Sequence, residues 1–149
     1  HLSERRDRKG AAAIELAVML PALMVLVFGI AELGLMLRAT STMYNIARQS
    51  ARAAAAGDKV AVIRKELETC DGLDATSLYL FMAYRAEGSS TWYVLSDDAY
   101  GNTAPTGAEV RAILIYGHKL LIPGLFGLEF GGQTSNVRWM IKTVTMRRA

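Results

Sequence analysis

The stretch that most constrains this chain is residues 10–37, GAAAIELAVMLPALMVLVFGIAELGLML, which holds no lysine or arginine. As a helix, this stretch reaches about 42 Å, more than the ~30 Å hydrocarbon core of a bilayer. The uncharged run between Glu15 and Glu32 is 16 residues, below the ~20 that a span normally needs. At least one carboxylate must therefore approach or enter the hydrocarbon, which is costly. We predict a transmembrane helix over residues 11–37.

Most of the net positive charge of the chain lies before this helix. Of the net charge of +3, residues 1–10 carry +2, from four basic and two acidic side chains. The positive-inside bias predicts that this leader stays in the cytoplasm and that the rest of the chain lies across the membrane. A cleaved secretory signal is the competing interpretation, but residues 31–40 lack a clean A-x-A pair. Because the basic excess flanks a membrane span, we expect no nucleic-acid partner.

A helical pattern continues beyond the apolar stretch without a breaker. Small or apolar side chains recur at helical spacing, and polar side chains fill the opposite positions. We therefore predict a first helix over residues 12–56, about 68 Å long. Its row of Ala47, Ala51 and Ala55 either permits close approach of another backbone or packs within its own domain.

A second, shorter helix is predicted immediately after the first. Gly57 is a suitable residue to end the first helix, because glycine adopts the left-handed conformation that helix C-termini favour. Asp58 is a suitable N-cap for a helix over residues 58–69. Residues 38–70 are therefore expected to form a helical region outside the membrane.

From residue 71 onward the composition is that of a β domain. Aromatic and β-branched residues are concentrated in four segments bounded by turn-forming residues, at 76–85, 91–95, 108–116 and 136–146. We predict antiparallel strands there, with a polar loop over 96–107 and an apolar, glycine-punctuated connection over 117–135. Apolar positions change phase within the last segment, which predicts a bulge or burial of both faces.

Residues that would indicate an enzyme or a metal site are sparse. The chain contains no Gly-rich phosphate loop, no H-E-x-x-H and no G-x-S-x-G motif. One cysteine, Cys70, cannot form an internal disulfide, and two histidines make a metal cluster improbable. Asp97 and Asp98 are expected to be solvated, and His118 to lie at the surface or at a strand end. We expect neither an enzyme nor a catalytic residue, cofactor or metal site.

One constellation at the start of the chain carries a family resemblance. A basic tail, Gly10, the small residue Ala11, Glu15 and an apolar helix with Pro21 resemble the class III signal of type IV pilin-like proteins. Within that group, residues 8–34 and the later QSARAAAAGD resemble the TadE-like minor pilins, or pseudopilins, of the tight-adherence (Tad) type IVc pilus system. The terminal MIKTVTMRR resembles the last strand of that family.

The resemblance implies specific roles for three residues. A prepilin peptidase would cleave between Gly10 and Ala11, and Glu15 would serve assembly. A glycine at the cut supplies backbone flexibility. Glu15 of one subunit would neutralise the new α-amine of Ala11 on a neighbour, which repays part of the desolvation of both charges. The alternative for Glu15 is an interfacial glutamate that snorkels to the cytoplasm. Glu32 is expected at the opposite interface.

These observations predict an α+β fold with a lollipop arrangement: a long N-terminal transmembrane helix, a short second helix and a small antiparallel sheet over residues 71–149. The resemblance implies a non-catalytic minor pilin that assembles or primes a Tad pilus. Its partners would be the prepilin peptidase, other Tad pilins and the pilus assembly platform. It would be a single-pass protein of the bacterial inner membrane with a periplasmic C-terminal domain, and it would enter the extracellular pilus. The alternatives are a single-span membrane-anchored periplasmic binding or sensor protein, and a membrane-tethered enzyme.

Overall fold

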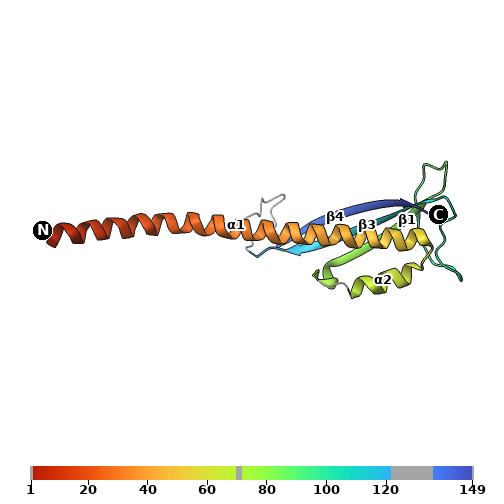
Figure 1. The fold of residues 1–149 in the computed structure, drawn as a ribbon, viewed down its shortest axis with the longest axis horizontal. Coiled ribbons are helices and arrows are strands. Elements are labelled where there is room, and N and C mark those ends of the chain that lie inside the picture. The colour runs from red at the N-terminus through yellow and green to blue at the C-terminus, as the bar shows by residue number, and fades with distance from the viewer. Residues whose placement is uncertain (1, 70–71, 122–135, 149) are drawn as a thin grey trace. The chain divides into compact units, whose positions relative to one another are not determined.

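The computed structural model describes residues 2–69, 72–121 and 136–148. The chain divides into two compact units, one of residues 1–35 and 120–136 and the other of residues 36–119 and 137–149. The elements, in chain order, are α1 (Leu2–Ala56), α2 (Val60–Glu68), the 3-10 helix η1 (Ala75–Ser77), β1 (Leu78–Arg85), β2 (Tyr93–Val94), β3 (Glu109–Lys119) and β4 (Val137–Arg147) (Figure 1). The predicted α+β fold is confirmed, with a long N-terminal apolar helix, a short second helix and an antiparallel sheet of four strands.

Helix α1 begins at Leu2, earlier than the predicted start at residue 12. Four of the ten leader residues are arginine or lysine, which are good helix formers, so the leader extends the apolar helix at its N-terminal side. Pro21 lies inside α1 and does not end it.

The part of α1 that follows Met36 is amphipathic, as predicted. Met43, Ala47 and Ala51 are fully buried, whereas Asn45 and Arg52 on the other side are exposed. The alanines therefore pack within their own domain, which was one of the two alternatives. Full burial of a side chain the size of Met43 contributes about 1.5–3 kcal/mol relative to an exposed one.

The turn between α1 and α2 confirms one prediction and corrects another. Gly57 has φ +99°, and its N–H donates to the Ala54 oxygen while the N–H of Asp58 donates to the Ala53 oxygen, each at 3.1 Å. These two bonds make a Schellman motif, so Gly57 ends α1 as predicted. The prediction that Asp58 caps the second helix is wrong, because α2 begins only at Val60. The Schellman motif uses the backbone of Asp58, so the new helix starts later.

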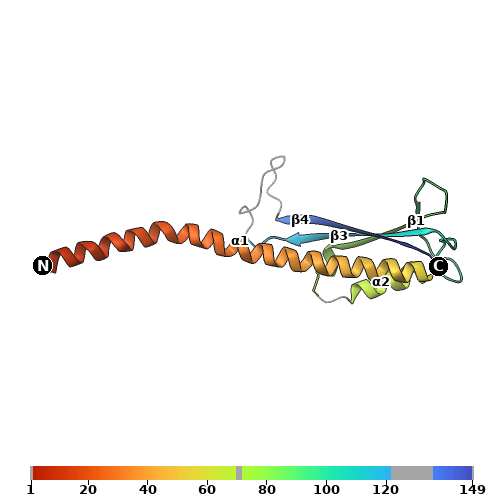
Figure 2. The same cartoon turned by 45° about the horizontal axis from the view of Figure 1, so that its top comes forward.

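The sheet has the strand order β2-β1-β3-β4, and all neighbouring strands are antiparallel. α1 and α2 lie on one face of it (Figure 2). That face is lined by alternate residues of β3 that are all buried, namely Val110, Ala112, Leu114 and Tyr116. They form one hydrophobic core with buried residues of both helices. Short alanine side chains on both sides let the helix approach the sheet closely.

Strand β4 differs from its prediction. Its register with β3 runs without interruption from the pair Glu109 and Arg147 to the pair Lys119 and Val137, so it contains no bulge. Met140, Val144 and Met146 pack against the core, whereas Trp139 is 58% exposed on the opposite face. Apolar residues therefore occupy both faces of β4 although only one face is covered by the helices.

The other strand boundaries shift by a few residues. β2 is only Tyr93–Val94, shorter than predicted, and β3 continues to Lys119. The predicted connection over 117–135 lies outside the described residues from 122 onward, as does Cys70.

Candidate functional site

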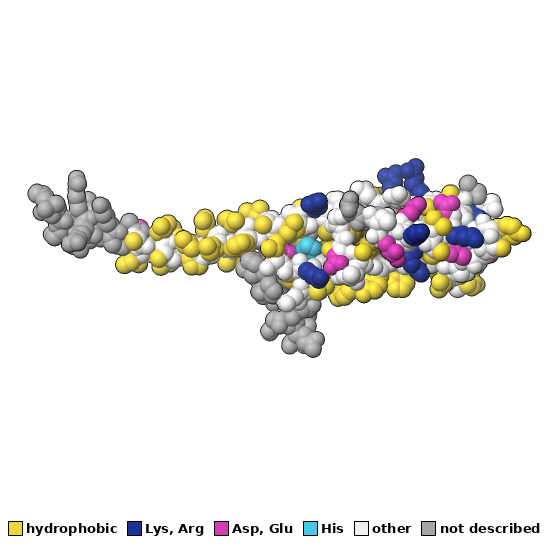
Figure 3. Space-filling model, turned by 90° about the horizontal axis from the view of Figure 1, so that it is seen from below, with side chains coloured by type: hydrophobic (Ala, Val, Ile, Leu, Met, Phe, Trp, Pro, Cys, Tyr) yellow, Lys and Arg dark blue, Asp and Glu magenta, His cyan; other side chains and the backbone are white. Residues whose placement is uncertain are grey.

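The most unusual surface of this chain is the apolar part of α1. It is the one helix among the described residues that is long and apolar enough to cross a membrane, and its most apolar window has a mean hydropathy of 2.4 with no residue buried. Hydrophobic side chains cover the face of this segment shown in Figure 3. Side chains such as Val18, Leu26 and Leu37 are 73%, 60% and 69% exposed. A helix that is apolar around its circumference needs lipid or other helices as its surroundings. The segment thus fits a single-pass membrane anchor.

The three predicted site residues lie at the N-terminal end of this segment. Gly10, Ala11 and Glu15 are all within α1. The spacing of four residues between Ala11 and Glu15 places them one helical turn apart, on one face. The Glu15 side chain is exposed and forms no ion pair with any residue that the structure describes. Its carboxylate is therefore available to a group outside this chain.

The second carboxylate of the apolar segment has a different environment. Glu32 is 2% exposed, and its Oε2 accepts a hydrogen bond from the backbone N–H of Leu121 at 2.8 Å. A buried carboxylate requires such donors because its desolvation is otherwise uncompensated. The prediction from the sequence placed Glu32 at an interface and did not foresee this contact. Since Leu121 is 89 residues away in the chain, no local pattern could reveal it.

The two adjacent aspartates of the polar loop have separate structural roles. Asp97 accepts hydrogen bonds from the backbone N–H groups of Val60 and Ala61, the second at 3.0 Å, and thereby caps α2. The Asp98 carboxylate accepts bonds from the N–H groups of Tyr100 and Gly101, each at 2.8 Å, and these bonds lower its pKa. Asp97 thus takes the capping role that the sequence assigned to Asp58.

Features that would support an enzyme are few in the described part of the chain. No group of three His, Cys, Asp or Glu side chains there could hold a metal ion. A groove of about 330 Å³ lies between α2 and β1, and its ionisable lining residues are Arg64, Glu68 and Tyr79. His118 is the penultimate residue of β3, a strand end as predicted, but it is buried rather than at the surface.

Comparison with known protein families matches the N-terminal part of the chain. Residues 10–52 match the family model described as TadE-like protein. The comparisons with curated proteins and with solved structures gave no match. The family match confirms the resemblance predicted from the residues around Gly10, and it associates the chain with the Tad pilus system. Residues 10–52 of this chain are therefore similar to TadE-like proteins, and the apolar helix to which they belong fits a single-pass membrane anchor.

Proposed function

We propose that this protein is a minor pilin, or pseudopilin, that takes part in assembling or priming a Tad pilus and has no catalytic activity. The observation that carries the proposal is the family match, which starts at residue 10, the glycine of the proposed processing site. A prepilin peptidase cleaves between Gly10 and Ala11, and the mature subunit stays in the inner membrane through its apolar helix, with its C-terminal domain in the periplasm.

Two properties of α1 support this proposal. First, Gly10 lies within the helix, where a glycine costs about 1 kcal/mol relative to alanine. It therefore lowers the cost of unwinding the backbone for a peptidase. Second, the apolar surface of the helix carries the exposed Glu15 near its N-terminal end. Lateral packing of such helices from several pilins buries this surface and brings Glu15 near the Ala11 amine of a neighbour.

The decisive experiment is N-terminal sequencing of the mature protein from cells that assemble the pilus. We expect the mature chain to begin at Ala11 and the Gly10→Leu variant to remain a longer, membrane-held precursor. The Arg6→Leu variant is the control, because it adds the same side chain inside the leader without altering the junction. If the native mature protein begins upstream of Gly10, the protein is not processed as a pilin, and the membrane-anchored binding or sensor protein becomes the better interpretation.

The proposed orientation needs a separate measurement. Alkaline phosphatase fused after Ala149 is expected to be active, because that enzyme folds only in the periplasm, whereas the same reporter fused before the apolar helix should be inactive. The reverse pattern would contradict the topology that the basic leader predicts.

A further inference from the structure

Strand β4 forms the longer of the two edges of the sheet. β2 forms one edge with two residues, whereas β4 forms the other edge with 11 residues. Among the described residues, no strand pairs with the side of β4 that faces away from β3. β4 contains no proline and no bulge, two devices that block an edge, but it carries lysine and arginine, which disfavour any added strand that lacks opposite charge. It can therefore act as a template for a further strand of opposite charge.

The hydrogen bonds near the ends of β4 show which backbone groups point outward. The Arg148 N–H donates to the Ala108 oxygen at 2.7 Å, and the Leu120 N–H donates to the Asn136 oxygen at 2.9 Å. Both bonds continue the register of β3 with β4, so the even-numbered residues of β4 direct their backbone groups toward β3. The odd-numbered residues therefore direct their N–H and C=O groups away from β3, among them Ile141, Thr143 and Thr145.

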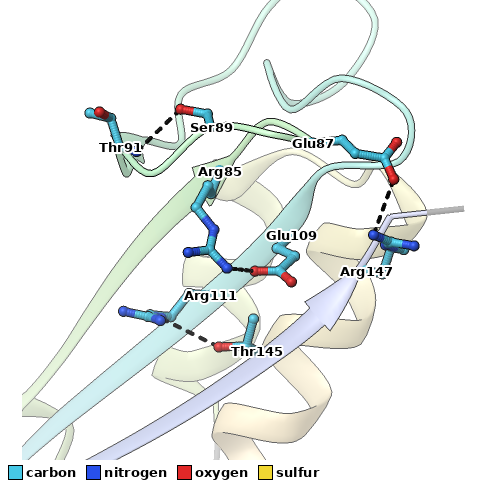
Figure 4. A network of polar contacts seen from close by, with 8 residues as sticks. All are labelled: Arg85, Glu87, Ser89, Thr91, Glu109, Arg111, Thr145 and Arg147. Carbon is cyan, nitrogen blue, oxygen red and sulfur yellow. Dashed lines mark hydrogen bonds and ion pairs between the residues drawn. The ribbon is translucent and has the colours of Figure 1, made fainter.

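The side chains of β4 give this edge a positive charge. The strand carries Arg138, Lys142 and Arg147 and no acidic residue. Arg147 already pairs with Glu87 at 3.3 Å (Figure 4). Arg138 and Lys142 form no ion pair within the described ranges. They lie on the same face of β4, about 13 Å apart, because side chains alternate along a strand that rises ~3.3 Å per residue.

We propose that the outer side of β4 binds an extended acidic segment of a different polypeptide as an additional antiparallel strand. The segment carries two carboxylates four residues apart, opposite Arg138 and Lys142. Even-numbered residues of β4 would form the non-hydrogen-bonded pairs with this strand, in which Cβ atoms lie only about 4.5–5.5 Å apart. A second copy of β4 offers no carboxylate at all, so charge complementarity favours another protein. The inference depends only on the unit that contains the sheet and not on processing at Gly10.

Binding of a designed peptide to the full chain in detergent micelles tests whether the outward backbone groups of β4 pair with an added strand. The probe is a fluorescent nine-residue peptide of alternating threonine and valine with glutamates four residues apart, and binding is followed by anisotropy. We expect saturable binding that weakens at least about tenfold in Thr143→Pro, because proline removes an outward N–H and no bond to β3. Thr143→Val is the matched control and should bind normally, since it keeps the N–H.

Reversing the charges of Arg138 and Lys142 tests whether the bound segment is acidic. The double variant Arg138→Glu, Lys142→Glu should lose about tenfold in affinity for the glutamate peptide and gain as much for a peptide with lysines at the same positions. The same double change in the exposed helix positions Arg48 and Arg52 should alter neither affinity.

Site-resolved hydrogen exchange of the unmodified protein supplies a measurement that does not require a variant to fold. The peptide should newly protect the amides of Ile141, Thr143 and Thr145, whereas the even-numbered amides are already protected by β3. The proposal is overturned if no peptide binds up to about 1 mM, if binding leaves these odd-numbered amides unprotected, or if they become protected by rising protein concentration alone, which indicates pairing between copies of this chain.

Discussion

The side-chain amide of Asn102 donates a hydrogen bond to the backbone oxygen of Ala54 at 2.8 Å, in the last turn of α1. The same Nδ2 donates to the Asp58 oxygen at 2.9 Å, and Oδ1 accepts from the guanidinium of Arg148 at 2.8 Å. Asn102 is 4% exposed. One buried side chain thus joins the end of α1, the start of the next segment and the residue that follows β4.

Removal of this side chain should destabilise the domain. In Asn102→Ala, the carbonyl oxygens of Ala54 and Asp58 lose the bonds that the Asn102 amide donates, and the Ala54 oxygen keeps the bond from the Gly57 N–H. We expect the free energy of unfolding to fall by about 1–3 kcal/mol, measured by urea denaturation in detergent with circular dichroism. Asn45→Ala is the control, because Asn45 is exposed on α1 and alanine is a good helix former. Equal losses in the two variants would contradict the structural role of Asn102.

The structure and the sequence assign the cap of α2 to different residues, Asp97 and Asp58. Asp97→Ala should lower the free energy of unfolding by about 0.5–2 kcal/mol, because two N–H groups at the start of α2 lose their acceptor. Asp58→Ala should change it by less than about 0.5 kcal/mol, because Asp58 is exposed and its side chain does not cap the helix. Denaturation of both variants under one set of conditions checks this, and the opposite ranking would restore Asp58 as the cap.

Acid should weaken the ion pair between Asp74, the N-cap of η1, and Lys119 at the end of β3. Hydrogen bonds from Thr76 and Lys119 lower the pKa of Asp74 from 3.8 to about 2. A carboxyl whose pKa is depressed in the folded state contributes stability above its unfolded pKa and loses that contribution as pH falls through the folded pKa. The midpoint temperature of unfolding should fall as the pH is lowered from about 4 to about 2. We expect this fall to be smaller in Asp74→Asn. An unchanged pH profile in this variant would show that Asp74 is not linked to folding.

Glu15 should affect assembly and not folding. If its carboxylate pairs with the Ala11 amine of a neighbour, Glu15→Ala leaves that amine without a counter-charge at membrane depth. We expect the variant to accumulate, insert and be cleaved normally, while pilus yield in sheared fractions and co-purification with other pilins fall. Glu15→Asp retains the charge and should partly preserve piliation. Normal piliation in a strain that carries only the alanine variant would exclude the proposed pairing.

Several features could be predicted from the sequence because they depend on residues close together in the chain. The apolar run of α1, the amphipathic pattern after Met36 and the helix end at Gly57 follow from helical spacing and from the backbone freedom of glycine. The resemblance around Gly10 and Glu15, which the family match over residues 10–52 confirms, is local in the same way. β-branched and aromatic composition located the strands but not the ends of β2 and β3.

The tertiary structure alone decided which distant groups meet. Asp97 caps a helix 37 residues earlier, Asn102 reaches Ala54 across 48 residues, and Leu121 donates to Glu32 across 89. Strand order likewise made β4 an edge, so that apolar residues on its second face are exposed although their pattern predicted a bulge or burial. Local periodicity specifies which face of an element is apolar, but the partner of a polar side chain depends on how loops close and strands pair, and neither is encoded in neighbouring residues.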